Sequence, residues 1–202
     1  VYRAPFPGCG APVEFRSAQS THAVCGYCQS TVVRDGEVLK RLGKMAELFD
    51  DHSLLQLGSA GLFDKQPFTL VGRLQYRYGE GTWTEWQVWF DDGRIGTLSE
   101  DNGAYVLSFP QDNQRALPAA EQFQVGATTT INGQPWGVAS NQQVSLVSAQ
   151  GELPRLPPIG QPFALVELRS QGDEGRVLSI DYGISPPAVS VGRAILLEDL
   201  AL

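Results

Sequence analysis

Three cysteines near the start of the sequence have the chemistry to bind a soft metal ion. Cys25 and Cys28 form a C-x-x-C pair, and Cys9 follows a Pro-Gly turn earlier in the chain. Two thiolates on one tight turn can point at a common ion, so the two turns together predict a zinc site. Residues 1–36 are therefore predicted to form a small zinc-ribbon-like module.

The fourth ligand of this zinc site is left open by the sequence. The pattern expects a ligand three residues before Cys9, where Phe6 stands. His22, three residues before the C-x-x-C pair, can supply an imidazole; a water molecule or a residue of another chain are the alternatives. A module that folds on its apolar contacts with reduced thiols is a further interpretation. Zinc here is predicted to be structural and to imply no catalysis.

A second set of residues, in the middle of the chain, combines aromatic rings with carboxylates. Rings beside carboxylates suit an organic cation, through cation–π attraction and ion pairing. The competing interpretation is a core of aromatic residues with solvated acids in the turns. The candidate ligand-binding residues are Trp83, Glu85, Trp86, Glu100, Asp101 and Tyr105.

The sequence does not predict an enzyme. Acidic pairs such as Asp91-Asp92 fall in turns, where Asp is favoured for backbone reasons. The two histidines, His22 and His52, lie outside the β-rich part of the chain, and we find neither a nucleophile elbow nor a phosphate-binding glycine loop. We expect a protein that binds without catalysing a reaction.

Composition narrows the class of protein. The 202 residues carry a net charge of −7, which makes a nucleic-acid partner unexpected. No apolar run approaches the roughly 18 residues of a membrane helix, so direct membrane insertion is not expected. An odd number of clustered cysteines is unlike a secreted disulfide scaffold and favours a cytoplasmic location. The 22 Gly and 13 Pro predict many tight turns, which is typical of proteins with short strands.

These turns indicate two β-rich units, which follow a predicted helix in the sequence. Apolar residues at helical spacing predict a linker helix over residues 37–52. The windows LGSAGLFDKQPFTLV and VGATTTINGQPWGVA begin at Leu57 and Val125, 68 residues apart, and indicate one hairpin unit used twice. The predicted fold is mainly β, with two related antiparallel barrel or curved-sheet subdomains at residues 53–118 and 119–202.

The stretches GAPVEFRSA, FTLVGRLQYRY and WTEWQVWFDDGRIGTLSEDNGAYVL, in this order behind a C-x-x-C turn, resemble a bacterial family known as domain of unknown function 4178. The resemblance covers nearly the whole chain. It implies a zinc ribbon with two complete C-x-x-C turns, from which Phe6 departs. It also implies an accessory role near polyamine aminopropyltransferases and membrane-stress proteins, with no assigned activity.

Two functions follow from these observations. The first is a non-catalytic accessory or scaffold protein that acts through protein–protein interaction, with the ribbon and helix presenting one surface and the acidic β-rich part another. The second is a small-molecule-binding protein for a polyamine or another organic cation. Co-purification of a protein partner and calorimetry with spermidine distinguish the two.

Overall fold

The computed structural model describes residues 1–45, 47–79, 81–113 and 115–202. The chain is mainly β, which confirms the predicted fold class. In these ranges no helix is long and apolar enough to cross a membrane. The strands are β1 (Tyr2–Pro5), β2 (Pro12–Phe15), β3 (His22–Val24), β4 (Ser30–Asp35), β5 (Val38–Lys44), β6 (Ala60–Phe63), β7 (Gln66–Tyr78), β8 (Gly81–Phe90), β9 (Ile95–Asp101), β10 (Ala104–Gln111), β11 (Thr128–Ile131), β12 (Gln134–Leu153), β13 (Phe163–Ser170), β14 (Arg176–Asp181) and β15 (Ala188–Ile195), and the 3-10 helices are η1 (Ala120–Gln122) and η2 (Leu197–Leu200).

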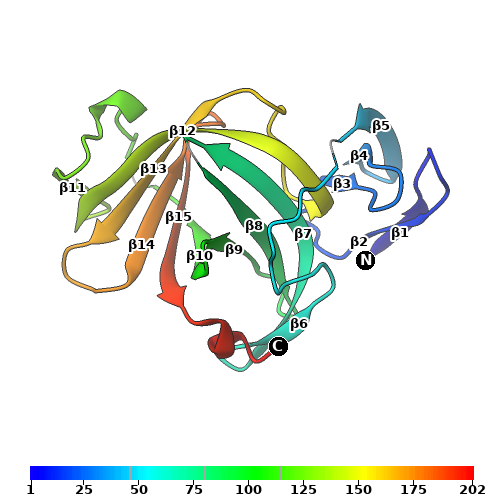
Figure 1. Cartoon of the computed structure of the whole chain (residues 1–202), viewed down its shortest axis with the longest axis horizontal. Coiled ribbons are helices and arrows are strands. Elements are labelled where there is room, and N and C mark those ends of the chain that lie inside the picture. Colours follow the sequence, from blue (N-terminus) through cyan, green and yellow to red (C-terminus); the bar gives the residue numbers. More distant parts are fainter. Residues whose placement is uncertain (46, 80, 114) are drawn as a thin grey trace.

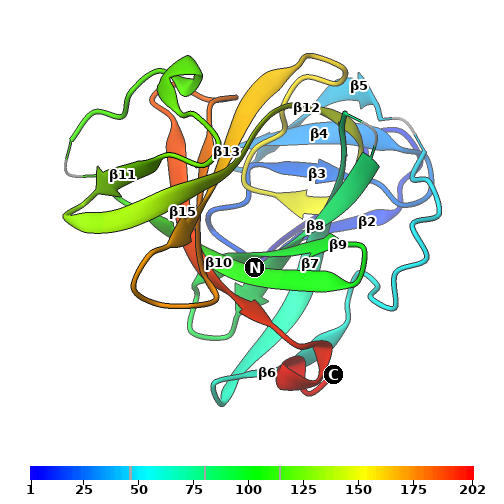
Figure 2. The same cartoon turned by 60° about the vertical axis from the view of Figure 1, so that its left-hand side comes forward.

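Eight strands close into an antiparallel ring (Figures 1 and 2). The order is β12-β13-β14-β15-β10-β9-β8-β7, and β7 pairs again with β12. Closure depends on the length of β12, because its residues 136–144 pair with β13 and its residues 145–151 pair with β7. Closing a sheet on itself removes exposed edges and encloses an interior.

The eight ring strands, with β6 and β11 beside them, fall into two halves with the same order of strands, β6 to β10 and β11 to β15. In the first half the pairing of β7 with β8 shifts register between Leu70 and Gly72. In the second half the pairing of β12 with β13 shifts between Val138 and Ser140, 68 residues further along the chain. The halves meet where equivalent strands pair, β7 with β12 and β10 with β15. Matching bulges and pairing of equivalents indicate one supersecondary unit used twice about a local two-fold axis.

Each half has its own apolar core, formed by side chains that alternate along the strands with those facing the ring interior. The first core contains Trp86 and Phe90 of β8, and the second contains Trp136 of β12. Leu200, after the second half, packs in the first core. Leu117, after the first half, packs against the second core. The two halves therefore exchange their terminal segments, which ties the ring together.

The N-terminal module is attached to the ring through strand β3. β1 and β2 pair with each other, whereas β3, β4 and β5 extend the main sheet from the C-terminal end of β12. In this pairing Val24 lies opposite Gly151. The buried Glu152 accepts a hydrogen bond from the backbone N–H of Ser17 at 2.9 Å. The module is thus fixed to the ring by a continuous sheet and a buried hydrogen bond.

The helix predicted over residues 37–52 is not formed, so that prediction is wrong. Val38–Lys44 is strand β5, which pairs antiparallel with β4. The reason is the Asp35-Gly36 turn: Gly36 has a φ of +62°, and a two-residue hairpin turns the chain back along β4. Residue 46, part of the apolar pattern, lies outside the described residues, and residues 47–52 have no regular secondary structure.

Candidate functional site

The three cysteines meet at the tips of two turns. Cys9 lies in the turn after β1, and Cys25 and Cys28 lie in the turn between β3 and β4. Their Sγ atoms all lie within 4.8 Å of one another, and those of Cys9 and Cys25 are 3.6 Å apart. Zinc–thiolate bonds of about 2.3 Å in a tetrahedron place neighbouring sulfurs about 3.8 Å apart. The three sulfurs can therefore bind a metal ion and occupy three corners of a tetrahedron around it.

The two turns have the same backbone structure. The N–H of Gln29 donates a hydrogen bond to the carbonyl of Cys25, and the N–H of Gly10 donates to the carbonyl of Phe6. Gln29 and Gly10 both have a positive φ, at the same place in each turn. This match makes Phe6 the counterpart of Cys25, so Phe6 stands at the backbone position that a fourth cysteine would take.

His22 does not join the cluster, which corrects its prediction as a ligand. It lies on strand β3, three residues before Cys25, and an odd separation along a strand points side chains to opposite faces. Its Nδ1 lies 2.8 Å from Thr21 Oγ1 instead. Burial lowers the pKa of His22 below its ordinary value.

Cys28 is an acidic thiol. Its Sγ lies 3.1 Å from the hydroxyl oxygen of Ser30. Hydrogen bonds from the side chain and then the backbone of Ser30 lower the pKa of Cys28 to about 6. A thiol with this pKa is mostly a thiolate at neutral pH, which is the form that binds metals.

A second candidate site is the interior of the ring, which contains a cavity of about 520 Å³. Side chains from all eight ring strands border it, together with Gln19, Pro154 and Arg155 from outside the ring strands. Ligand pockets commonly have volumes of about 300–1,000 Å³, and eight-stranded barrels are wide enough for one small ligand. The cavity has the size of a small-molecule site.

The structure divides the six predicted ligand-binding residues between two faces. The side chains of Trp83, Glu85 and Asp101 border the cavity. Glu100, on the opposite face, accepts hydrogen bonds from the Trp86 indole at 3.3 Å and the Tyr105 hydroxyl at 2.8 Å. The division follows from strand alternation, because residues 85 and 86, or 100 and 101, point in opposite directions. Trp86, Glu100 and Tyr105 therefore form a structural group outside the cavity.

Two carboxylates in the cavity are paired with arginines, and sequence reasoning missed both pairs. Asp181 of β14 contacts Arg155 at 2.6 Å, and Glu167 of β13 contacts Arg169 at 2.6 Å. Period-two alternation along these two strands could have placed the acids on the polar face. Nothing in the sequence indicated Arg155, because it reaches the cavity from the segment after β12.

Glu85 and Asp101 face the same cavity and have no basic partner among the described residues. Burial and the nearby charge of Asp181 raise the pKa of Glu85 to about 7. A hydrogen bond from Trp83 and the charge of Arg155 act in the opposite direction but are smaller effects. Oδ2 of Asp101 accepts a hydrogen bond from the Tyr78 hydroxyl at 2.9 Å. Its Oδ1 is buried and has no partner in the described part of the chain. Burial in the cavity thus disfavours the charged form of Glu85, which a bound cation would stabilise.

Aromatic rings stand beside these two carboxylates. Tyr76 and Trp83 are stacked, with ring centroids 4.8 Å apart and planes 14° apart. Tyr78 lies against the same indole at 5.4 Å, and Phe163 meets Tyr76 edge-on at 6.2 Å. A ring face with a carboxylate nearby attracts a cation and repels an anion. The cavity therefore offers charge and aromatic surface together.

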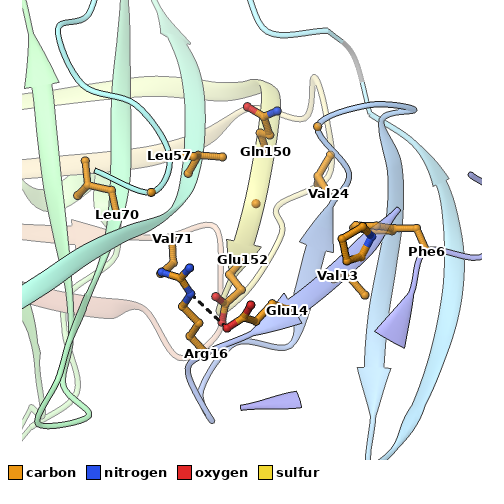
Figure 3. A pocket seen from close by; sticks show the side chains of 14 residues that line it. Phe6, Val13, Glu14, Arg16, Val24, Leu57, Leu70, Val71, Gln150 and Glu152 are labelled. Carbon is orange, nitrogen blue, oxygen red and sulfur yellow. Dashed lines mark ion pairs between the residues drawn. The ribbon is translucent and has the colours of Figure 1, made fainter. Parts of the chain in front are cut away.

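A smaller groove of about 250 Å³ separates the N-terminal module from the ring (Figure 3). Val13 and Val24 border it from the module, and Leu57 and Leu70 from the ring. The single ion pair drawn there joins Arg16 to Glu14 of the same strand region at 3.5 Å. Its walls are mostly apolar, and we assign the groove to packing between the two parts.

The family comparison agrees with the sequence resemblance. A family model described as Domain of unknown function (DUF4178) matches residues 56–197. This range covers most of both halves of the ring and leaves out the N-terminal module, whose ribbon character depends on the cysteine cluster alone. Neither the search of curated proteins nor the search of solved structures gives a match.

Proposed function

The chain belongs to the DUF4178 family, and we propose that it is a non-catalytic binding protein that holds a small organic cation inside its ring. The observation that carries the proposal is the pair Glu85 and Asp101, two carboxylates without a basic partner among the described residues, in a cavity of about 520 Å³. Buried charges are normally paired, so an unpaired carboxylate beside a cavity favours a ligand of opposite charge.

The charges and the aromatic rings of the cavity both favour a cation over a neutral or anionic ligand. The cavity is bordered by the carboxylates Glu85, Asp101, Glu167 and Asp181, against the guanidinium groups of Arg155 and Arg169. Both guanidinium groups are held by carboxylates, so neither is free to attract an anion. The stacked rings of Tyr76 and Trp83 give alkyl or ammonium groups an aromatic wall.

A linear polyamine is the ligand we propose to test first, since it carries several ammonium groups on a slender apolar chain. Two ammonium groups would be matched by Glu85 and Asp101, while the methylene groups contact the rings. The sequence resemblance, which implies neighbours in polyamine metabolism, points to the same class of ligand.

Calorimetry with spermidine tests this proposal. We expect saturable binding by the wild-type chain and, for Glu85→Gln or Asp101→Asn, a loss of about 10- to 100-fold in affinity, because each substitution removes a charge-assisted hydrogen bond. Asp91→Asn, in the exposed turn between β8 and β9, is the matched control and should bind like the wild type. Absence of heat at millimolar spermidine contradicts the proposal.

Turnover is the alternative outcome for the same cavity. A carboxyl group with a pKa near 7, such as Glu85, has the acidity of a general base. Binding without chemistry predicts that spermidine is recovered unchanged after prolonged incubation with the protein. A product detected by mass spectrometry and lost in Glu85→Gln would overturn the non-catalytic part of the proposal.

Docking of a protein partner is a second candidate function, favoured by strand β5. β5 is the edge of the main sheet, and its Val38 and Leu42 are 58% and 57% exposed. A free edge with exposed apolar side chains can accept a strand from another protein. We expect a partner recovered with the wild-type chain from native lysate to be lost with Leu42→Glu, which leaves the ring intact. Recovery of the same partner with both chains contradicts this docking mode.

At the cysteine cluster we propose a structural metal ion, with zinc as the ion that the two ribbon-like turns suggest. Cys9, Cys25 and Cys28 would hold it, and an ion there would fix the two turns to each other. Three reduced thiols in one site are maintained in a reducing compartment, so we propose a cytoplasmic location. Metal analysis of the natively purified chain tests this site.

A further inference from the structure

The residues at the cysteine cluster fit zinc only in part. Phe6 is the counterpart of Cys25 in the matching turn, so a residue without a ligand atom stands where the fourth cysteine would be. Phe6 is 5% exposed and packs in one core with Val13, Phe15 and Cys25. A residue held this firmly in a core is not readily displaced by a water molecule or by another side chain.

No other side chain of the described residues completes the site. The group of ligand atoms within 4.8 Å of one another consists of the three cysteines. His22 points to the other face of β3, and Glu47, which borders a neighbouring cavity with Cys25, is not part of the group. Protein zinc sites are almost always four-coordinate, so zinc bound here lacks one protein ligand.

An ion with a lone pair has the opposite requirement. Trivalent arsenic binds three thiolates in a pyramid, and its lone pair takes the fourth direction, where no ligand is needed. Three thiolates also neutralise the 3+ charge of arsenic, whereas the complex of Zn²⁺ with three thiolates has a net charge of −1. A neutral complex is better suited to the buried side of the site, where Cys25 packs with Phe6, while Cys9 on the other side is exposed. Burying a net charge beside Cys25 would be costly.

We propose that Cys9, Cys25 and Cys28 form a three-coordinate thiolate site that prefers a trivalent, lone-pair-bearing ion such as As(III) to zinc. The inference rests on the metal site proposed above and specifies its coordination. In the binding step, arsenous acid exchanges three hydroxyl groups for three sulfurs. Each thiol proton leaves with a hydroxyl as water, and arsenic keeps its oxidation state.

The test is a competition on the full-length reduced chain, followed by native mass spectrometry. The wild-type chain is loaded with zinc and titrated with arsenite. Phe6→Cys restores the fourth thiolate, and Phe6→Leu keeps an apolar residue without ligand atoms as the matched control. Circular dichroism checks that each variant is folded before metals are compared.

We expect arsenite to displace zinc from the wild-type chain and from Phe6→Leu, with a mass gain of one arsenic less three protons. Phe6→Cys should shift the competition toward zinc by about tenfold or more, equivalent to one gained ligand. Cys9→Ser should abolish the arsenic adduct. If the wild-type chain keeps zinc against arsenite as well as Phe6→Cys does, the preference is overturned while the metal site stands. If it binds neither ion, both the site and the preference fail.

Discussion

The two halves of the ring share their strand order and bulges but differ in the charges that they turn inward. The register places Glu85 of β8 at the position of Leu165 in β13, and Asp101 of β9 at the position of Gly183. The acids of the second half, in contrast, are held by arginines. The two halves therefore share their backbone plan, but among the described residues that border the cavity only the first half has carboxylates without a basic partner.

This difference separates positions that build the fold from positions that border the cavity. Core residues at equivalent positions of the two halves are apolar in both. Leu98 of the first half corresponds to Ile180 of the second, and Leu107 to Val189. The equivalents facing the cavity vary in charge and size. Core side chains are thus constrained by packing in both halves, whereas side chains that border the cavity are not held to one type by that packing.

The largest expected effect concerns the pH dependence of stability. Burial raises the pKa of Glu85 from 4.5 to about 7 in the folded protein, so the folded state holds its proton to higher pH than the unfolded chain does. Stability is therefore lost as pH rises through about 7. Glu85→Gln removes this loss and should stabilise the protein at pH 8 by up to about 3 kcal/mol relative to pH 4. Urea unfolding at both pH values measures it; an equal effect at both contradicts the assignment.

Making the first half resemble the second should weaken cation recognition. Glu85→Leu copies Leu165, its counterpart in β13, and should weaken spermidine binding by about 10- to 100-fold in calorimetry. Leu165→Met, a volume-conserving change at the equivalent position, should leave the affinity within about twofold. Equal losses from both substitutions would mean that the two halves contribute alike.

The equivalent β6–β7 and β11–β12 hairpins differ in how well their turn residues suit a positive φ. Asp64 and Lys65 have φ values of +48° and +65°, and Asn132 and Gly133 have +49° and +77°. Glycine adopts positive φ without strain, so Lys65→Gly should stabilise the chain by about 1 kcal/mol in urea unfolding. A destabilised Lys65→Gly variant would show that the lysine side chain outweighs its backbone strain.

The smallest expected effect concerns the aromatic wall. Trp83→Phe copies Phe163, the counterpart of Trp83 in the second half. It keeps a ring against Tyr76 but weakens cation–π attraction, so spermidine affinity should fall by about two- to fivefold. Isothermal titration at fixed pH and salt checks this, with Trp89→Phe on another part of β8 as the control. An unchanged affinity for Trp83→Phe would remove the ring from the binding account.

Local features of the fold were predictable because local turn chemistry determines them. The Asp92-Gly93 and Asn102-Gly103 turns join β8, β9 and β10 in sequence, with positive φ at Gly93 and Gly103. A turn of the same kind at Asp35-Gly36 produces strand β5, although the apolar spacing of the following residues predicted a helix. Hairpin signals therefore outweighed apolar periodicity where the two disagreed.

Long-range features were not predictable from the sequence. Ring closure depends on β12 changing partners from β13 to β7, and no local signal marks that change. The cavity pair of Arg155 and Asp181 is a consequence of that closure. Of the predicted ligand-binding set, Trp83, Glu85 and Asp101 share the cavity because alternation places them there, whereas their neighbours in sequence point outward. The cysteines were recognised by type and spacing, but His22 was not excluded until β3 defined its face.

Proton release on binding tests most directly whether Glu85 receives a cation in the ring. Spermidine is titrated near pH 7 into the wild-type chain and Glu85→Gln, in buffers of different ionisation enthalpy. A cation that forces Glu85, with its pKa of about 7, to ionise should release about half a proton from the wild-type chain and none from the variant. Binding heat independent of the buffer in the wild type, or equal proton release from both chains, would contradict the account.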